Sequence, residues 1–220
     1  MVFLAYFIYF TDKDVIKYDI IFSMVIANIL GIFILFYFLW SKLKEDYQYE
    51  RIFNLAFTTL LGFGIGAITS RYILQNYWFW LDLLGILLGF IVGIKRQKIK
   101  FFESFEGLVI GLLPWTSLIF LSDSIKNFSL SSFLAFWVTL ICVVIFFFIA
   151  SHYRSFTWYK SGRVGFAGTL TALLFFIFRL IATIFFKNVI SLAGKLDIYI
   201  SASVVLILFL LLYSLSRDIE

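Results

Sequence analysis

The chain has 220 residues, of which 63% are hydrophobic and 14% are charged, and its formal net charge is +5. Soluble domains are about half apolar and a quarter charged, so this composition excludes an ordinary soluble protein. The basic residues stand in short loops between apolar runs, where such residues orient helices and meet anionic headgroups. We therefore expect a membrane partner and no nucleic acid.

The chain begins with a segment whose apolar part is too short to cross a membrane. This part, Val2–Phe10, has nine residues, whereas a spanning helix needs about 20. It has no basic residues before it and no small-residue cleavage site, so it is not typical of a signal peptide. We expect residues 1–19 to lie at the membrane interface.

Seven apolar runs follow, each near the length of a membrane-spanning helix. They are residues 20–40, 53–73, 79–94, 105–121, 133–150, 164–186 and 198–215. The third and fourth runs are shorter, nearer 17 residues, which is typical of short spans in the interior of a bundle. The sequence therefore predicts an all-α integral membrane protein, a bundle of about seven transmembrane helices that forms a single membrane-embedded domain over residues 1–220.

The basic residues are divided unequally between the two sets of loops. One set holds eleven of them: Lys42, Lys44, Arg51, Lys95, Arg96, Lys98, Lys100, Arg154, Lys160, Arg163 and Arg217. The opposite set holds six: Lys13, Lys17, Arg71, Lys126, Lys187 and Lys195. Because the richer side is normally cytoplasmic, we predict a multi-pass protein of the bacterial plasma (inner) membrane, with its N-terminus outside and its C-terminus in the cytoplasm.

Glycines cluster in the second and third runs at Gly62, Gly64 and Gly66 and at Gly85, Gly89 and Gly93. Small residues repeated at such spacing let two membrane helices approach closely. A phosphate-binding glycine loop would need a strand before it, and no strand is predicted here. We therefore expect both clusters to pack against neighbouring helices.

Arg179 is an ionisable residue inside the sixth apolar run. Because a charge in the hydrocarbon region is costly, such a residue is a candidate for function. A guanidinium donates hydrogen bonds in pairs and suits a phosphate or a carboxylate. The alternative is that Arg179 extends along the helix to the nearby interface and only anchors it.

Two further charges, Arg71 and Asp82, stand near the outer ends of the second and third runs. They would pair across the short connection between the runs. Alternatively, Arg71 and Arg179 would face one cationic pocket that suits the headgroup of an anionic phospholipid. The single cysteine and the single histidine have no cluster of metal ligands around them, so we expect no metal and no cofactor.

Four fragments in chain order carry a family resemblance. Ile16-Lys17-Tyr18 precedes the first run, and a glycine-rich stretch, Leu61–Tyr72, ends the second. The third run is followed by a basic loop and Phe101–Glu106, and Phe178-Arg179 lies in the sixth run. In this order the fragments resemble prolipoprotein diacylglyceryl transferase, an integral enzyme, and the similarity covers most of the chain.

The resemblance implies transfer of a diacylglyceryl group from phosphatidylglycerol to the lipobox cysteine of a prolipoprotein. It makes Arg179 and Tyr18 the catalytic candidates. Asn127, in Asn127-Phe128, resembles the end of a family signature and joins Arg71 and Asp82 as a lipid-binding candidate. The implied partners are phosphatidylglycerol, an anionic phospholipid, and the signal peptide of a prolipoprotein.

The chain also departs from the family. Leu84-Gly85-Ile86 replaces a His-Gly-Gly motif, the signature arginine expected near Leu121 is missing, and a family glutamate falls on Thr183. Thioether formation needs a base and cations. The sequence therefore predicts either a divergent transferase or a lipid-binding or scaffold relative without the chemistry. A small transporter ranks last, because no pair of broken helices recurs in matching halves.

Overall fold

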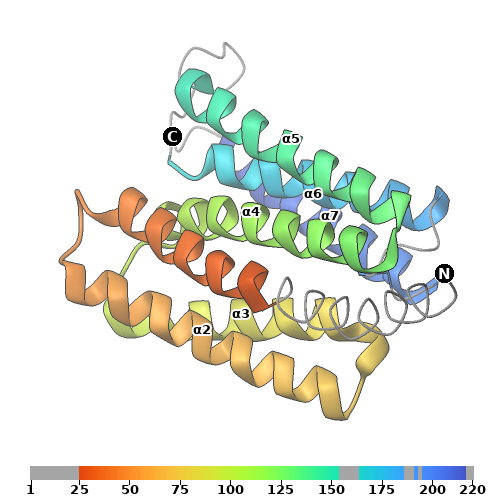
Figure 1. Ribbon diagram of the computed structural model, residues 1–220. Coiled ribbons are helices and arrows are strands. Elements are labelled where there is room, and N and C mark those ends of the chain that lie inside the picture. The colour runs from red at the N-terminus through yellow and green to blue at the C-terminus, as the bar shows by residue number, and fades with distance from the viewer. Residues whose placement is uncertain (1–24, 154–163, 186–190, 193–194, 217–220) are drawn as a thin grey trace, which may run out of the picture.

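The computed structural model describes residues 25–153, 164–185, 191–192 and 195–216. Its helices are a first helix, Val25–Leu43, then α2 (Tyr49–Tyr72), α3 (Trp78–Gln97), α4 (Phe101–Asn127), α5 (Leu130–His152), α6 (Phe166–Phe185) and α7 (Lys195–Ser216), with a 3-10 turn at Gln75–Tyr77 (Figure 1). Seven helices in the described ranges are long and apolar enough to cross a membrane, which confirms the predicted all-α bundle. The predicted interfacial segment, residues 1–19, lies outside the described residues.

The third and fourth helices are longer than the apolar runs from which they were predicted. Helix α3 has 20 residues and α4 has 27. Both continue beyond their apolar runs through polar residues, among them Lys95 and Arg96 in α3 and Glu103 and Lys126 in α4. At 1.5 Å per residue, α4 is about 40 Å long and matches a bilayer with its headgroup regions. Composition marks the hydrocarbon-crossing part of such a helix and misses its ends.

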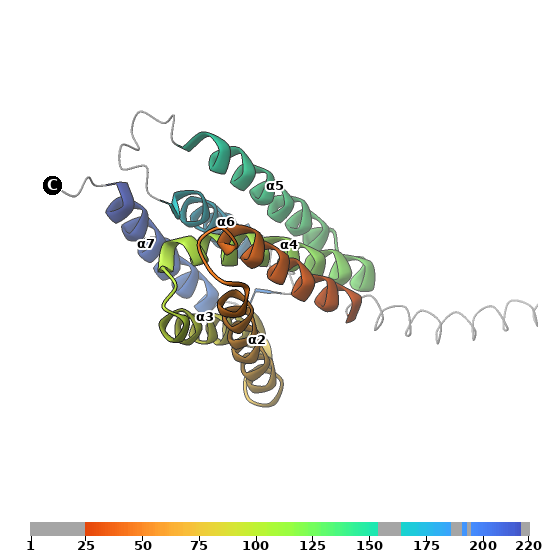
Figure 2. The same cartoon turned by 90° about the vertical axis from the view of Figure 1, so that its left-hand side faces the viewer.

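Helix α4 occupies the middle of the bundle. The α2–α3 hairpin forms one edge and α5 the opposite edge, as both views show (Figures 1 and 2). The buried share of the membrane-crossing window is 56% in α4 and 50% in α6, against 17–33% in the other five helices. Side chains of α4 and α6 are therefore placed to build an internal site, while the outer helices face lipid.

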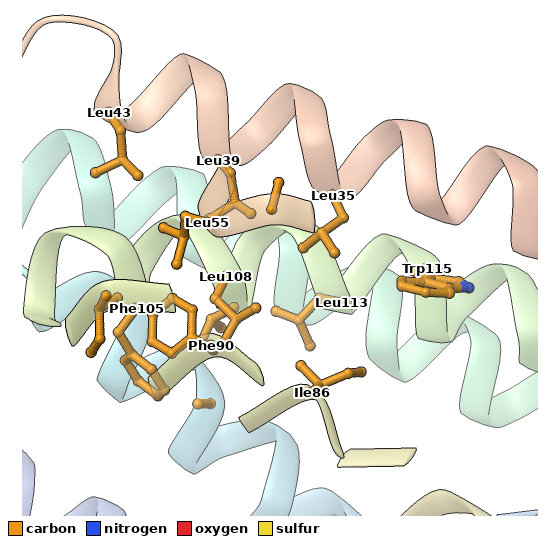
Figure 3. Packing of buried hydrophobic residues seen from close by; sticks show 14 of the residues in the cluster. Leu35, Leu39, Leu43, Leu55, Ile86, Phe90, Phe105, Leu108, Leu113 and Trp115 are labelled. Atoms are coloured by element: carbon orange, nitrogen blue, oxygen red, sulfur yellow. The ribbon is translucent and has the colours of Figure 1, made fainter. Parts of the chain in front are cut away.

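The first helix is attached to the bundle by a row of leucines. Leu35, Leu39 and Leu43 repeat every four residues, which places them on one face, and they point toward Leu55 of α2 and Leu108 of α4 (Figure 3). All five side chains are at most 1% exposed. This packing holds the first helix, α2 and α4 together.

Helices α2 and α3 meet through their glycines. A Cβ atom added at Gly85 would overlap the carbonyl oxygen of Gly62, and one added at Gly89 would overlap that of Thr58. A Cβ at Gly93 would meet the Thr58 hydroxyl. The predicted packing role of the third-run glycines is confirmed. Gly64 departs from the prediction, since nothing lies within 4 Å of its added Cβ; two residues from Gly62, it falls on another face of the helix.

The orientation in the membrane stays a prediction, and the ends of α4 offer its test. Lys98 lies just before α4 and Lys126 in its last turn, so the two lie at opposite ends of the bundle. We expect reporter fusions at Lys98 and Arg154 to report the cytoplasm, and a fusion at Lys126 to report the exterior. The reverse pattern would contradict the predicted orientation. Below, the "outer end" is the end of the bundle that holds Lys126.

Candidate functional site

Arg179 is buried in α6, and both of its terminal guanidinium nitrogens donate hydrogen bonds within its own chain. Its side chain donates from Nη2 to both carboxylate oxygens of Asp197, at 2.9 and 3.1 Å. It also donates to the hydroxyl and the backbone carbonyl of Ser191, at 2.7 and 2.5 Å. The residue is only 5% exposed. Arg179 therefore does not extend to water, and the interfacial-anchor alternative does not describe it.

Asp197, in the first turn of α7, is the centre of this polar network. It is fully buried and accepts further hydrogen bonds from Trp80 Nε1 of α3 at 2.9 Å and from Ser201 Oγ at 3.2 Å. Donors from α3, α6 and α7 thus converge on one carboxylate. Because a buried charge needs both a counter-ion and hydrogen bonds, the Arg179–Asp197 network fixes the relative positions of three helices at the outer end.

Aromatic rings complete the surroundings of the guanidinium. The Arg179 Cζ atom lies 3.8 Å from the ring centroid of Phe79 and 5.0 Å from that of Trp80, and Trp80 stacks on Phe176. Such contacts stabilise a cation through the ring quadrupole. Since the charges of Arg179 and Asp197 cancel, the network offers no net positive charge to a phosphate. Only Nε of Arg179 is buried without a hydrogen-bond partner among the described residues.

The predicted partners of Arg179 do not join it. Tyr18 lies outside the described residues. Arg71 is exposed at the end of α2, and no ion pair joins it to Asp82 or brings it to Arg179 in the part of the chain that the structure describes. Asn127 donates to Asp123 Oδ1 at 2.7 Å in the last turn of α4. The predictions of an Arg71–Asp82 pair and of a two-arginine pocket are therefore wrong, because Arg179 of α6 pairs with Asp197 of α7.

A central cavity of about 320 Å³ lies between α3, α4, α6 and α7. Its lining is almost entirely apolar, and Asp82 is the single charged residue in it among the described residues. Helix α4 contributes one face from Phe101 to Ile119. Those eighteen residue steps correspond to about 27 Å at 1.5 Å each, close to the hydrocarbon thickness of about 30 Å. The cavity is thus long and narrow.

Asp82 stands at the outer end of this cavity, in the second turn of α3. Its Oδ1 atom lies 3.3 Å from the hydroxyl of Ser70. The same hydroxyl lies 3.0 Å from the carbonyl of Ala67. Thr116, also in the lining, donates to the carbonyl of Leu112 within its own helix. Asp82 is therefore the polar group that the cavity presents.

A second polar group lies at the other end of the bundle. Glu106 is 5% exposed and accepts from Lys42 Nζ at 2.7 Å and from the backbone N–H of Gly165 at 3.0 Å. Nearby, Glu103 accepts from Tyr47 and from Lys100. The hydrogen bond that Lys100 donates to Glu103 raises the pKa of Lys100, and burial raises the pKa of Tyr47. These contacts connect the first helix, α4 and α6.

Among the described residues, no histidine contacts the Arg179 network. His152, the only histidine in the sequence, ends α5 at the end of the bundle opposite Arg179, where it contacts Ser151. Within the described ranges, no three His, Cys, Asp or Glu side chains gather in a way that could hold a metal ion. The titratable group that contacts Arg179 among the described residues is the carboxylate of Asp197.

The fold and the site define a class: a multi-pass α-helical membrane protein, with seven candidate spans in its described residues and a buried ion-pair network near a long apolar cavity. Comparison with protein-family models, with curated proteins and with solved structures finds no match to this chain. Sequence reasoning found Arg179 and Asp82 but missed Asp197 and Trp80. The only signal for Asp197 was a carboxylate directly before the last apolar run.

Proposed function

We propose that this protein binds a lipid in its central cavity and does not carry out diacylglyceryl transfer. The observation that carries the proposal is the shape of the cavity together with its lining. Ligand pockets are mostly apolar, measure about 300–1,000 Å³ and hold a few placed polar groups. The cavity of about 320 Å³, with one carboxylate at its outer end, has these properties.

The length of the cavity favours a chain-like occupant. The α4 face from Phe101 to Ile119 follows most of the hydrocarbon thickness, and a volume this small over that length leaves room for a narrow, extended molecule. A hydrocarbon chain meets both requirements, and lipid is the ligand at hand in a membrane. Burial of apolar surface by Leu112, Phe176 and Leu208 would stabilise it.

The surroundings of Arg179 argue against the transferase alternative. Transfer from phosphatidylglycerol needs cations that stabilise a phosphate leaving group and a base that activates a thiol. Asp197 already neutralises Arg179 at 2.9 Å, and the one histidine is at the other end of the bundle. A carboxylate at Asp82 would repel a phosphate rather than bind it.

Filling the cavity tests the proposal. In Ala172→Leu, extra methylenes enter the cavity from α6. A clash of about 1–3 kcal/mol with a bound chain should lower lipid retention about tenfold, as counted by native mass spectrometry of protein purified in mild detergent. The matched control is Ala202→Leu on the exposed side of α7, which should retain lipid as the wild type does. Equal retention by all three proteins would contradict lipid binding in this cavity.

An activity assay of the purified wild-type protein distinguishes lipid binding from diacylglyceryl transfer. Wild-type protein incubated with phosphatidylglycerol and a lipobox peptide should leave the mass of the peptide unchanged. Expression in cells depleted of their own transferase should likewise restore no lipidated lipoprotein. A peptide that gains a diacylglyceryl group would instead favour the divergent transferase, and Arg179 would then have to leave Asp197 during the reaction.

A further inference from the structure

The cavity holds an intramembrane carboxylate whose hydrogen bonding is incomplete. An ionisable residue within a membrane-spanning helix is costly and normally has a partner. Asp82 is partly exposed, and among the described residues its one hydrogen-bond contact is the Ser70 hydroxyl at 3.3 Å. In the described part of the chain no lysine or arginine pairs with it. Because Asp82 lines the cavity, a molecule in the cavity can reach its carboxylate and complete its hydrogen bonding.

The Ser70 hydroxyl is a poor donor to Asp82. A serine hydroxyl carries a single proton, and the carbonyl of Ala67 competes for it from the shorter distance of 3.0 Å. The backbone carbonyl is part of the same helix as Ser70 and cannot move away. Oxygen atoms of Asp82 are therefore left to accept from the cavity side.

Two other carboxylates of the bundle, those of Asp197 and Asp123, each accept hydrogen bonds from at least two side chains. Asp197 accepts from Arg179, Trp80 and Ser201. Asp123 accepts from Asn127 and Ser132. Asp82 differs from both, because, among the described residues, a single side chain, that of Ser70, makes a hydrogen-bond contact with it. It is also the one carboxylate among the three that lines the central cavity.

We infer that Asp82 binds the headgroup of the cavity lipid by accepting a hydrogen bond from an N–H or O–H group of that headgroup. This inference rests on the proposed lipid binding and specifies its chemistry. The second turn of α3 places Asp82 near the outer interface, where a headgroup lies when its chain extends inward. An ammonium group serves best, because its charge is opposite to that of the carboxylate; a hydroxyl serves without that advantage.

Lipids that differ only at the headgroup test the inference. Full-length protein is equilibrated with vesicles containing equal parts of phosphatidylethanolamine, phosphatidylcholine and phosphatidylglycerol, and retained lipids are identified by native mass spectrometry. The first two are both zwitterionic, but only the ethanolamine headgroup has N–H donors. We expect it to be retained about tenfold over the choline lipid, the ratio that corresponds to one charge-assisted hydrogen bond. Retention of the glycerol lipid at the same level would assign the donor to a hydroxyl.

Variants assign the preference to Asp82. Asp82→Leu should retain the same total lipid with no preference between ethanolamine and choline headgroups. Asp82→Asn, which keeps the shape and one acceptor, should retain a reduced preference and guards against misfolding of the leucine variant. Thr69→Val, next to Ser70 on α2 but outside the cavity lining, is the control and should keep the wild-type preference, because the Thr69 hydroxyl is bonded to the carbonyl of Ile65 in its own helix.

The outcomes separate the two proposals. Equal retention of all three lipids by the wild type would overturn the role of Asp82 and leave lipid binding intact. An unchanged preference in both Asp82 variants would overturn it as well. Retention of no lipid by the wild type would contradict the proposed function itself.

Discussion

Replacing Asp197 with alanine is expected to lower the free energy of unfolding by about 3–5 kcal/mol, because it leaves a buried charge without its counter-ion. Arg179 and Asp197 have side chains that are 3% and 0% exposed, so neither can turn to water. Trp80 Nε1 would lose its acceptor at the same time. Thermal unfolding in detergent, followed by helical circular dichroism, should show a midpoint about 10 °C lower.

Removing both charges together should be much milder. In Arg179→Met with Asp197→Leu, apolar side chains of similar size replace the pair, a change that is often neutral in buried ion pairs. Arg71→Met is the matched control, since Arg71 is exposed and should change stability by less than about 0.5 kcal/mol. If Asp197→Ala behaved like Arg71→Met, the ion pair would have no role in holding α6 and α7 together.

Gly89→Leu is expected to separate α2 from α3 and to lower the free energy of unfolding by about 3 kcal/mol or more. A Cβ atom at this position would overlap the backbone carbonyl of Thr58. Because the obstacle is backbone, no rotamer change relieves it, and the helices have to move apart. The yield of folded protein after size-exclusion chromatography in detergent should fall, together with the unfolding midpoint.

Alanine at two glycines gives the matched comparison. Gly89→Ala adds only the Cβ that meets Thr58, whereas Gly64→Ala adds one with no atom within 4 Å. The first should destabilise the protein. The second should be neutral or stabilising by up to about 1 kcal/mol, since alanine favours a helix over glycine. Equal stabilities of the two variants would show that the close approach of α2 and α3 contributes little.

The class of the fold could be predicted from the amino-acid sequence. In lipid, the backbone N–H and C=O groups of a long apolar run must form their hydrogen bonds within the run, as in a helix. Seven apolar runs therefore predicted seven spans. The glycine spacing predicted the tight α2–α3 contact, since three- and four-residue repeats fall on one helical face. Boundaries were less well determined, because polar residues such as Glu103 and Lys126 continue a helix into the interface, where composition no longer distinguishes it from a loop.

Which charges form pairs, and where a cavity remains, depends on how the helices pack against one another. Arg179 and Asp82 were recognisable as candidates because a charge in an apolar run is costly. Their partners were not, since Arg179 of α6 pairs with Asp197 of α7, and Arg71 is exposed and forms no ion pair with Asp82 among the described residues. The cavity likewise follows from how far α3 stands from α4, α6 and α7, and no local pattern encodes that distance. Sequence periodicity fixes the face a side chain occupies, but helix packing decides what that face meets.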